Sequence, residues 1–217
     1  MALRRFRYPD KPTRCGPSFV TRLNPAEWVS EHKYDGWRLL IHNVSAGIEL
    51  PDGGKAVGLS LLTSQGRHFS SIDRATIPPE IRKQIERLEL PDDTVLDSEF
   101  VGPRGKHKPA IYIFDCLAWE GLWQVNTPFS QRRATCEQLA PRFGADLHLS
   151  ELRRGDFMAH FNELKDLWQN GGMGMDLCEG IVLKRLSGKM QLDLADHKHS
   201  ADIYKFKYRE IREPTAY

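Results

Sequence analysis

The sequence predicts an α+β fold in which antiparallel sheets dominate and helices flank them. Short apolar segments rich in β-branched and aromatic residues alternate with helical patterns, and Gly, Pro or Asp bounds most of them. No βαβ unit repeats along the chain, which argues against a parallel sheet. With 217 residues and 40% hydrophobic content, the chain can bury one sizeable core, so we expect a single domain over residues 1–217.

Six segments have the composition of strands. They are residues 37–42, 60–63, 94–101, 110–117, 147–152 and 180–185. The tetrapeptide Asp52-Gly53-Gly54-Lys55 predicts a hairpin turn, because glycine supplies the backbone conformations that tight turns need.

Three helices are expected between these strands. The first opens at Pro78-Pro79-Glu80, and apolar residues follow it at helical spacing. Ser130 predicts the N-cap of a second helix that runs to about Leu139. The third starts near Asp156, and its apolar stripe predicts core packing. That stripe consists of Phe157, Phe161, Leu164 and Trp168.

Composition excludes several classes of protein. No apolar run is long enough to cross a bilayer, and the N-terminus lacks the apolar segment of a secretory signal, so we expect an intracellular protein. The 4 cysteines are scattered without a C-x-x-C pair, which predicts reduced thiols and no zinc site. The net charge is only +2, but basic residues cluster near the N-terminus, around residues 104–108 and in residues 184–212.

The hexapeptide Lys33-Tyr34-Asp35-Gly36-Trp37-Arg38 predicts covalent chemistry at a lysine. A lysine amine attacks phosphorus only in its neutral form, which nearby cations or desolvation favour, and the bond it forms divides one difficult transfer into easier steps. Lys33 is the candidate nucleophile. The hexapeptide alone is equally compatible with a charged turn between two strands.

Four further motifs follow, and their order and spacing favour the catalytic interpretation. They are Leu96-Asp97-Ser98-Glu99, Ile113-Phe114-Asp115-Cys116-Leu117, Glu179-Gly180-Ile181-Val182-Leu183-Lys184 and Lys205-Phe206-Lys207. Together with the hexapeptide, they resemble the five nucleotidyltransferase motifs of ATP-dependent DNA ligases, which RNA ligases and mRNA capping enzymes share. The resemblance covers about residues 27–209 and implies the ligase-type nucleotidyltransferase fold, which is similar to ATP-grasp.

The resemblance assigns catalytic roles to four residues. Lys33 would carry AMP, Asp35 would orient its loop, and Lys205 and Lys207 would contact the α-phosphate. On a strand these last two amines share one face while Phe206 points to the core.

The remaining assignments concern the nucleotide and the metal. Glu31 would accept from the adenine amino group, Phe114 would stack on the base, and the aliphatic residues Ile181 and Val182 would close the other side of the slot. Arg38 would contact the ribose or the phosphates, and Lys184 would add its positive charge to that of Lys205 and Lys207 near the α-phosphate. Glu99 and Glu179 would hold Mg²⁺, which Mn²⁺ can replace, and ATP is the expected cofactor.

Two features depart from the family pattern. Ser64 lies in Thr63-Ser64-Gln65-Gly66, where many ligases have an arginine, and Arg67 is a candidate substitute. The sequence ends at Tyr217, soon after Lys207, where an oligonucleotide-binding domain usually follows. We therefore expect either a ligase made of the nucleotidyltransferase domain alone or a piece of a longer one.

The predicted function is an ATP-dependent polynucleotide ligase that seals nicks in duplex DNA, acts as a monomer and serves repair or replication. NAD is disfavoured as donor, because only 32 residues precede Lys33 and the NAD-dependent ligases need a larger N-terminal domain. The alternatives are an RNA or RNA–DNA hybrid ligase, a capping guanylyltransferase, and a nucleic-acid-binding module without turnover.

Phosphate contacts from basic clusters are expected to hold the nucleic acid without reading its sequence. The candidate residues are Arg4, Arg5, Arg7, Lys106, Lys108, Lys189 and Lys198.

Overall fold

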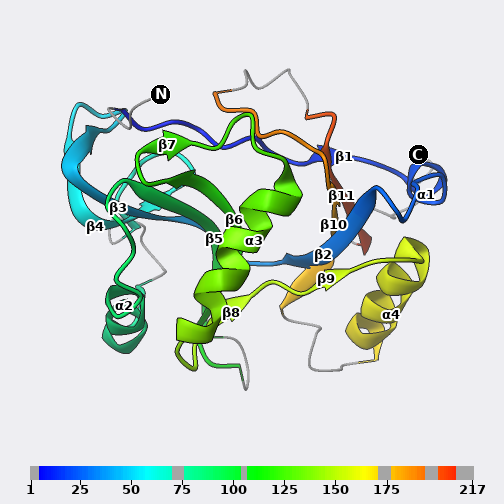
Figure 1. Cartoon of the computed structure of the whole chain (residues 1–217). Coiled ribbons are helices and arrows are strands. Elements are labelled where there is room, and N and C mark those ends of the chain that lie inside the picture. Colours follow the sequence, from blue (N-terminus) through cyan, green and yellow to red (C-terminus); the bar gives the residue numbers. More distant parts are fainter. Residues whose placement is uncertain (1–4, 70–75, 104–106, 171–176, 194–199, 209–217) are drawn as a thin grey trace, which may run out of the picture. The chain divides into compact units, whose positions relative to one another are not determined.

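The computed structural model describes residues 5–69, 76–103, 107–170, 177–193 and 200–208, and the chain forms two compact units. The first unit comprises residues 1–10, 36–150 and 189–198, and the second comprises residues 11–35, 151–188 and 199–217. Each unit is built on its own sheet (Figure 1). The expectation of one nucleotidyltransferase domain over residues 1–217 stays a prediction.

The first unit contains a six-stranded sheet in the order β4-β3-β5-β6-β7, with β8 beside β6. All neighbours are antiparallel except β6 and β8, which are parallel. Its strands are β3 (Trp37–Glu49), β4 (Lys55–Thr63), β5 (Thr94–Val101), β6 (Ala110–Trp119), β7 (Leu122–Trp123) and β8 (Leu147–Leu149).

Both faces of this sheet are covered, because alternate residues of β3 enter different hydrophobic clusters. Leu39 and Ile41 join a cluster that includes residues of the helices α2 (Pro79–Glu86) and α3 (Phe129–Leu139). Leu40 lies on the opposite face, in a cluster that includes Phe6 and Met190. A short 3₁₀ helix, η2 (Ala140–Arg142), follows α3.

A buried ion pair ties α3 to the sheet. The Arg132 guanidinium donates to both oxygens of Asp115 on β6, at 2.9 and 2.8 Å, and both side chains are buried. Because this bidentate pair is shielded from water, breaking it would leave an uncompensated buried charge. It holds α3 beside β6, where Figure 1 shows the helix.

The second unit contains a five-stranded sheet in the order β1-β11-β10-β2-β9. Its strands are β1 (Thr13–Arg14), β2 (Trp28–Tyr34), β9 (Leu152–Arg153), β10 (Cys178–Arg185) and β11 (Ile203–Lys207). Only the pairing of β1 with β11 is parallel.

Helix α4 (Phe157–Gln169) covers one face of this second sheet, and the short helix α1 (Pro17–Val20) lies near it. Phe161 stacks on Phe206 of β11 with ring centroids 4.0 Å apart. Ile181 and Leu183 of β10 belong to the same hydrophobic cluster. Since successive strand residues point to opposite faces, the neighbours of these apolar residues project from the other face of the sheet.

Residues on that opposite face are mostly charged. We call it the polar face of the second unit and define it by Glu31, Lys33, Glu179, Val182, Lys184, Lys205 and Lys207.

The predicted fold class is confirmed, and most predicted elements are present with longer bounds than expected. Strand β5 matches its prediction, whereas β3, β4, β6 and β10 extend further. The predicted turn after β3 is confirmed: the Leu50 N–H donates to the Gly54 carbonyl at 2.9 Å, and Gly53 has φ +82°.

Three predictions of local structure are wrong. Residues 147–152 form two short strands, β8 and β9, which belong to different sheets. Ser130 does not cap α3, because the helix starts at Phe129 with Pro128 as N-cap. Strand β2 was not predicted, although it carries Lys33. Its sequence, Trp28 to Tyr34, contains Ser, Glu, His and Lys and therefore lacks the apolar pattern of a strand. The cap at Asp156 is confirmed by its bond from the Ala159 N–H.

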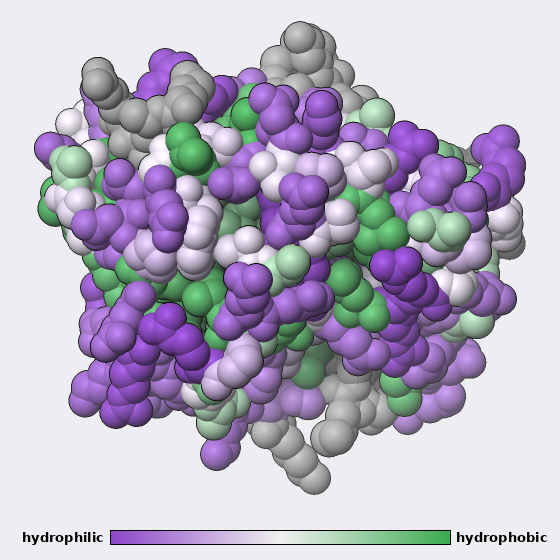
Figure 2. Space-filling view, in the orientation of Figure 1, coloured by the Kyte–Doolittle hydropathy of each residue, from purple (hydrophilic) through white to green (hydrophobic). Residues whose placement is uncertain are grey.

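The visible surface of the chain is largely hydrophilic, with small apolar areas between charged residues (Figure 2). Among the described residues, the exposed large hydrophobic side chains are Tyr8, Val57, Leu122 and Leu167. Within the described part of the chain, no helix combines the length and apolar character that a membrane span needs.

Candidate active site

Lys33 is held by a carboxylate that it shares with a second lysine. Its Nζ lies 2.5 Å from Glu179 Oε1, and Lys207 Nζ lies 2.8 Å from Glu179 Oε2. The three side chains come from β2, β10 and β11, neighbouring strands of the second unit. Each is between 13% and 20% exposed, so the cluster is shielded but reachable from solvent.

The charge of Glu179 is stabilised by these two lysines. Burial raises the pKa of its carboxyl, but the hydrogen bonds from Lys207 and Lys33 outweigh burial and lower the pKa below its ordinary value. Glu179 is therefore ionised at neutral pH. An ionised carboxylate orients an amine well but is a weak base toward it.

The backbone around Glu179 explains why the motif contains glycine. The pairing of β10 with β2 shifts register between Cys178 and Ile181, which is a β-bulge. Gly180 in this bulge has φ +145°, and a Cβ there would overlap the Phe206 carbonyl and the Lys207 Cα. Only glycine therefore lets β10 approach β11 closely enough for Glu179 to meet Lys207.

The end of β2 is fixed beside the start of β10. The Asp35 N–H donates to the Leu177 carbonyl at 2.7 Å. On the helix side of β2, the Ser30 hydroxyl and His160 Nδ1 of α4 are 2.8 Å apart. Burial, with the positive charge of Arg153 and the neighbouring His32, lowers the pKa of His160 to about 4, so this support is neutral at pH 7.

Glu31 and Lys184 form a second ion pair on the polar face. Lys184 Nζ lies 2.8 Å from Glu31 Oε2, and both side chains are buried. The family resemblance assigns these two residues to adenine and to phosphate, respectively. The structure brings them together, and their roles toward a nucleotide stay predictions.

Lys205 and Lys207 have the expected arrangement on β11. Both are half-buried, whereas Phe206 between them is buried in the hydrophobic cluster under α4. Their amines therefore share the polar face with Lys33, as the alternation in the motif predicts.

The assignment of Ile181 to a nucleotide slot conflicts with its position. Ile181 has no exposed surface and packs in the cluster under α4, on the face opposite Lys33. Its neighbour Val182 is half-buried, lies on the polar face, and is the Cα partner of both Glu31 and Lys205. Val182 is the aliphatic residue that a ligand on this face could contact. The β-bulge at Gly180 reverses the alternation that a regular strand predicts.

Arg38 lies in the first unit and is fixed by protein groups. Its guanidinium donates to both carboxylate oxygens of Asp97 and, at 2.8 Å, to the carbonyl of Asp10. Burial alone would lower the pKa of Arg38, but Asp97 outweighs burial and raises it. Sequence reasoning missed Asp97, although its position two residues before Glu99 on the same strand face was an available signal.

Glu99 and Phe114 also belong to the first unit. Glu99 Oε1 accepts from the Gly36 N–H at 3.2 Å, and Arg38 and Glu99 are Cα partners across β3 and β5. A Cβ on Gly36 would overlap the Phe100 carbonyl, so this approach requires glycine. Phe114 is half-buried at a bulge in the pairing of β5 with β6.

The expected metal ligands Glu99 and Glu179 lie in different units. Each provides hard oxygen donors of the kind that Mg²⁺ prefers, together with phosphate oxygens and water. Across the described ranges, no group of three or more His, Cys, Asp or Glu residues is placed to hold a metal. All four cysteines are free thiols in this structure.

The basic residues expected to bind nucleic acid have different environments. Arg7 forms an ion pair with Asp193 at 2.6 Å, which neutralises its charge locally. Arg5, Lys108 and Lys189 of the first unit are exposed. The other candidates lie outside the described residues. These are Arg4, Lys106 and Lys198.

Arg67, the candidate substitute for the missing arginine at Ser64, is exposed. It follows a tight turn in which Gly66 has φ +75°, and the Arg67 N–H donates to Thr63 Oγ1 at 3.2 Å. The Trp168 side chain, expected in the core, is outside the described part of the structure.

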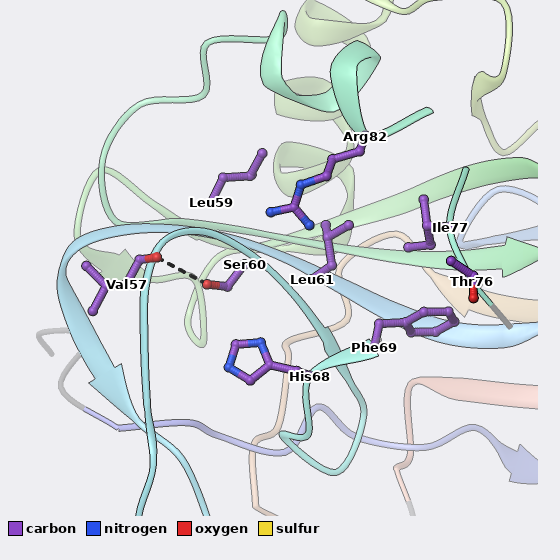
Figure 3. A pocket seen from close by; sticks show the side chains of 9 residues that line it. All are labelled: Val57, Leu59, Ser60, Leu61, His68, Phe69, Thr76, Ile77 and Arg82. Atoms are coloured by element: carbon purple, nitrogen blue, oxygen red, sulfur yellow. Dashed lines mark hydrogen bonds between the residues drawn. The ribbon is translucent and has the colours of Figure 1, made fainter. Parts of the chain in front are cut away.

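A cavity of about 320 Å³ lies in the first unit between β4, the segment after it and α2 (Figure 3). Leu59, Leu61, Phe69 and Ile77 supply apolar walls, and Arg82 points toward it from α2. None of the residues predicted from the motifs lines this cavity. It is therefore separate from the clusters described above.

Comparison with known proteins identifies the fold. No protein-family model and no curated protein matches the chain. Among solved structures, the ligase domain of M. tuberculosis LigD matches with a TM-score of 0.65 and 23% identity, over 93% of this chain and 59% of that chain. Mycobacterial DNA ligase D complexed with ATP and MES gives a TM-score of 0.65 and 23% identity, over 93% and 60%.

A viral structure gives a similar result. Chlorella virus DNA ligase-adenylate matches with a TM-score of 0.55 and 13% identity, over 95% of this chain and 68% of that chain. The chain spans about three fifths of the two mycobacterial structures, at 59% and 60% of their lengths. This chain therefore has the fold of the nucleotidyltransferase domains of ATP-dependent DNA ligases.

Proposed function

We propose that this chain is the nucleotidyltransferase part of an ATP-dependent ligase that seals nicks in duplex DNA through AMP bound covalently to Lys33. The observation that carries the proposal is the cluster of Lys33, Glu179 and Lys207 on three neighbouring strands. It combines an amine nucleophile, a group that orients it and a cation for phosphate. The fold that this chain shares with ATP-dependent ligase domains supports the same interpretation.

In the first step, the lone pair of the deprotonated Lys33 Nζ attacks the α-phosphorus of ATP. A nitrogen–phosphorus bond forms as the nitrogen gives up one proton to water, the bond from the α-phosphorus to the bridging oxygen breaks, and its electron pair leaves with pyrophosphate. Glu179 orients the amine through its hydrogen bond to Nζ. Lys205 and Lys207 stabilise the negative charge that develops on the transferred phosphoryl group.

In the second step, an oxygen of the 5′-phosphate attacks the phosphorus of lysyl-AMP, the nitrogen–phosphorus bond breaks, and the Lys33 nitrogen takes up a proton. In the third, the 3′-hydroxyl oxygen loses its proton to water and attacks the 5′-phosphorus, and the bond from that phosphorus to AMP breaks as AMP leaves. The second step reacts again at the phosphorus of AMP, and in the third the phosphate of AMP gains charge as it leaves. The same lysines therefore serve all three steps.

Glu99 and Glu179 each offer oxygen donors of the kind that Mg²⁺ prefers and would hold the ion, which would neutralise charge on the phosphate oxygens. Each oxygen of Glu179 accepts one hydrogen bond from a lysine and retains a second lone pair. The carboxylate can therefore orient the two lysines and still face a cation.

The proposal extends to the setting in which the enzyme acts. Its donor, ATP, is an intracellular metabolite, so we place the activity inside the cell, in the repair or replication of DNA. We propose that the protein acts as a monomer on DNA, because the cluster around Lys33 is built from one chain.

The test is covalent labelling followed by a chase. The purified chain is incubated with ATP or GTP labelled at the α-phosphate and with Mg²⁺, and label on the denatured protein is measured. We expect label from ATP, and its release when nicked DNA is added. A panel of nicked DNA, nicked RNA–DNA hybrids and single-stranded RNA then identifies the acceptor.

The Lys33→Ala variant should take up no label while keeping the fold, because its side chain lies on a surface of the sheet outside the core. Lys83→Ala is a matched control, since Lys83 is exposed on α2. Covalent AMP on Lys33→Ala would refute the assignment of the nucleophile. Label from GTP alone would identify a guanylyltransferase instead.

A further inference from the structure

The edge strand β1 places an arginine beside the candidate phosphate-binding lysines. Arg14 is the Cα partner of Lys205 in the parallel pairing of β1 with β11, and Thr13 is the partner of Tyr204. The pairing continues past the strand, because the Cys15 N–H donates to the Lys205 carbonyl at 3.1 Å. Figure 1 shows β1 next to β11.

The packing of neighbouring residues shows which face Arg14 occupies. Cys15 and Tyr204 pack against the hydrophobic cluster under α4 that also contains Phe206. Residues that alternate with these project from the opposite face. Arg14 and Lys205 therefore share the polar face of the second unit, and Arg14 is exposed there.

This position extends a cationic surface by one strand. On the described strands, the polar face carries the carboxylates Glu31 and Glu179, which pair with Lys184 and with Lys33 and Lys207, respectively. Its cations outnumber these carboxylates. They are Arg14, Lys33, Lys184, Lys205 and Lys207.

The order of the strands places the cations of this surface in a row that runs from β2 to the edge strand β1. Lys33 is on β2, Lys205 and Lys207 are on β11, and Arg14 is on β1 beyond them. Neighbouring strands are about 4.8 Å apart, which is comparable to the length of a short polyphosphate. When an α-phosphate lies between Lys33 and the β11 lysines, phosphates attached to it can reach β1.

We propose that Arg14 binds the β- and γ-phosphates of the nucleoside triphosphate and stabilises pyrophosphate as it leaves. The inference rests on the proposed lysyl-AMP chemistry and assigns it one further residue. A guanidinium suits this task because it stays charged and binds two phosphate oxygens at once. When the bond to the α-phosphorus breaks, the departing oxygen gains the electron pair, and Arg14 lies where that charge accumulates.

The contact between Arg14 and pyrophosphate must also act in the reverse reaction, in which ATP re-forms from lysyl-AMP and pyrophosphate. An oxygen of pyrophosphate attacks the phosphorus of lysyl-AMP, the nitrogen–phosphorus bond breaks, and the Lys33 nitrogen takes up a proton as ATP is released. Later steps involve no pyrophosphate. Arg14 should therefore affect formation and pyrophosphate-driven discharge of lysyl-AMP, but not transfer of AMP to DNA.

The test compares Arg14→Ala, Arg14→Lys and the control Arg22→Ala with the wild-type chain. Arg22 is an exposed arginine of the same unit whose Nε donates to the Ser18 carbonyl. We expect Arg14→Ala to raise the KM for ATP in lysyl-AMP formation and to slow discharge by inorganic pyrophosphate, each about tenfold or more. Arg14→Lys should restore part of both, and Arg22→Ala should change neither.

Single-turnover sealing separates this proposal from its rivals. Enzyme already loaded with AMP is mixed with nicked DNA in the absence of ATP, and we expect equal rates for Arg14→Ala and wild type. The proposal is wrong if Arg14→Ala leaves the KM for ATP and the discharge rate unchanged. It is also wrong if the variant instead loses sealing and salt-sensitive DNA binding. A wild-type chain that forms no lysyl-AMP would overturn the proposed function itself.

Discussion

Replacing Glu179 by glutamine tests how the candidate active site is held together. The Glu179→Gln variant keeps the size of the side chain and removes its negative charge. In the wild type, that charge accepts hydrogen bonds from Lys33 at 2.5 Å and Lys207 at 2.8 Å. Without it, two ammonium groups lie near each other and lack their shared counterion.

The expected loss of stability can be worked from these two hydrogen bonds. A hydrogen bond to a charged group is worth about 1.5–3 kcal/mol, which sets an upper limit of about 3–6 kcal/mol for two such bonds. Because the three side chains are 13–20% exposed, water screens part of this energy. We expect the free energy of unfolding at pH 7 to fall by about 2–4 kcal/mol.

The effect should depend on pH in a defined direction. Burial raises the pKa of Glu179, but Lys207 and Lys33 lower it below the ordinary value of 4.5 that applies in the unfolded chain. A carboxyl with a lowered folded pKa contributes stability above its unfolded pKa and loses it as the pH falls through its folded pKa. The difference between wild type and variant should therefore be constant from neutral pH to the unfolded pKa and shrink below it.

Urea unfolding followed by tryptophan fluorescence, at several pH values from neutral to acidic, measures this difference. Glu163→Gln is the control. Glu163 of α4 makes an exposed ion pair with Arg153 of β9 at 2.6 Å, so its replacement should change the free energy of unfolding by less than about 1 kcal/mol. A difference for Glu179→Gln that is no larger than for the control, or that is unchanged at acidic pH, would refute the shared-carboxylate arrangement.

Three further predictions concern other parts of the chain. Phe114→Ala should weaken ATP binding by about 1–3 kcal/mol because the base no longer stacks on a ring, as calorimetry would measure, and unchanged affinity would remove Phe114 from the site. Burial lowers the pKa of His42 from 6.5 to about 3, so acid favours the unfolded chain, which takes up this proton first. As the pH falls from 6.5 to about 3, the free energy of unfolding of the wild type should fall by about 1.4 kcal/mol per pH unit through this residue. The His42→Leu variant should show a smaller slope of this free energy against pH. Replacing the exposed cations Arg5, Lys108 and Lys189 by glutamine should flatten the salt dependence of nick binding, by about 0.9 in the log–log slope for each phosphate that the variant no longer neutralises, with lysyl-AMP formation unchanged. An unchanged slope would show that these residues lie away from the nucleic acid.

Patterns within single elements were readable from the amino-acid sequence. Local patterns predicted the packing of Phe157, Phe161 and Leu164 on α4, the cap at Asp156 and the alternation along β11, and the structure follows all three. The alternation of strand and helix patterns indicated the α+β fold, and the order of the motifs indicated the ligase resemblance. These features depend on residue type and spacing along the chain, so no knowledge of long-range pairing was needed.

Departures from regular strand periodicity could not be predicted from the amino-acid sequence. The β-bulge at Gly180 places Ile181 in the core and Val182 on the polar face, so only one of the two aliphatic residues predicted for the nucleotide slot lies on that face. A bulge depends on how one strand meets its neighbours, here on the close approach of Gly180 to the Phe206 carbonyl. Ionic partners between distant segments are set in the same way. Arg38 meets Asp97, and Lys184 meets Glu31, because strand register brings them together.

The sequence by itself determined the kinds of chemistry present: an amine for covalent transfer, carboxylates, and cations for phosphate. Tertiary structure alone decided which of these groups share one surface. Glu179 joins Lys33 and Lys207 only because β10 lies between β2 and β11, and Arg14 joins Lys205 only because β1 adds in parallel to the sheet edge. The physical reason is that charge interactions act through space, and strand pairing sets distances in space that spacing along the chain does not contain.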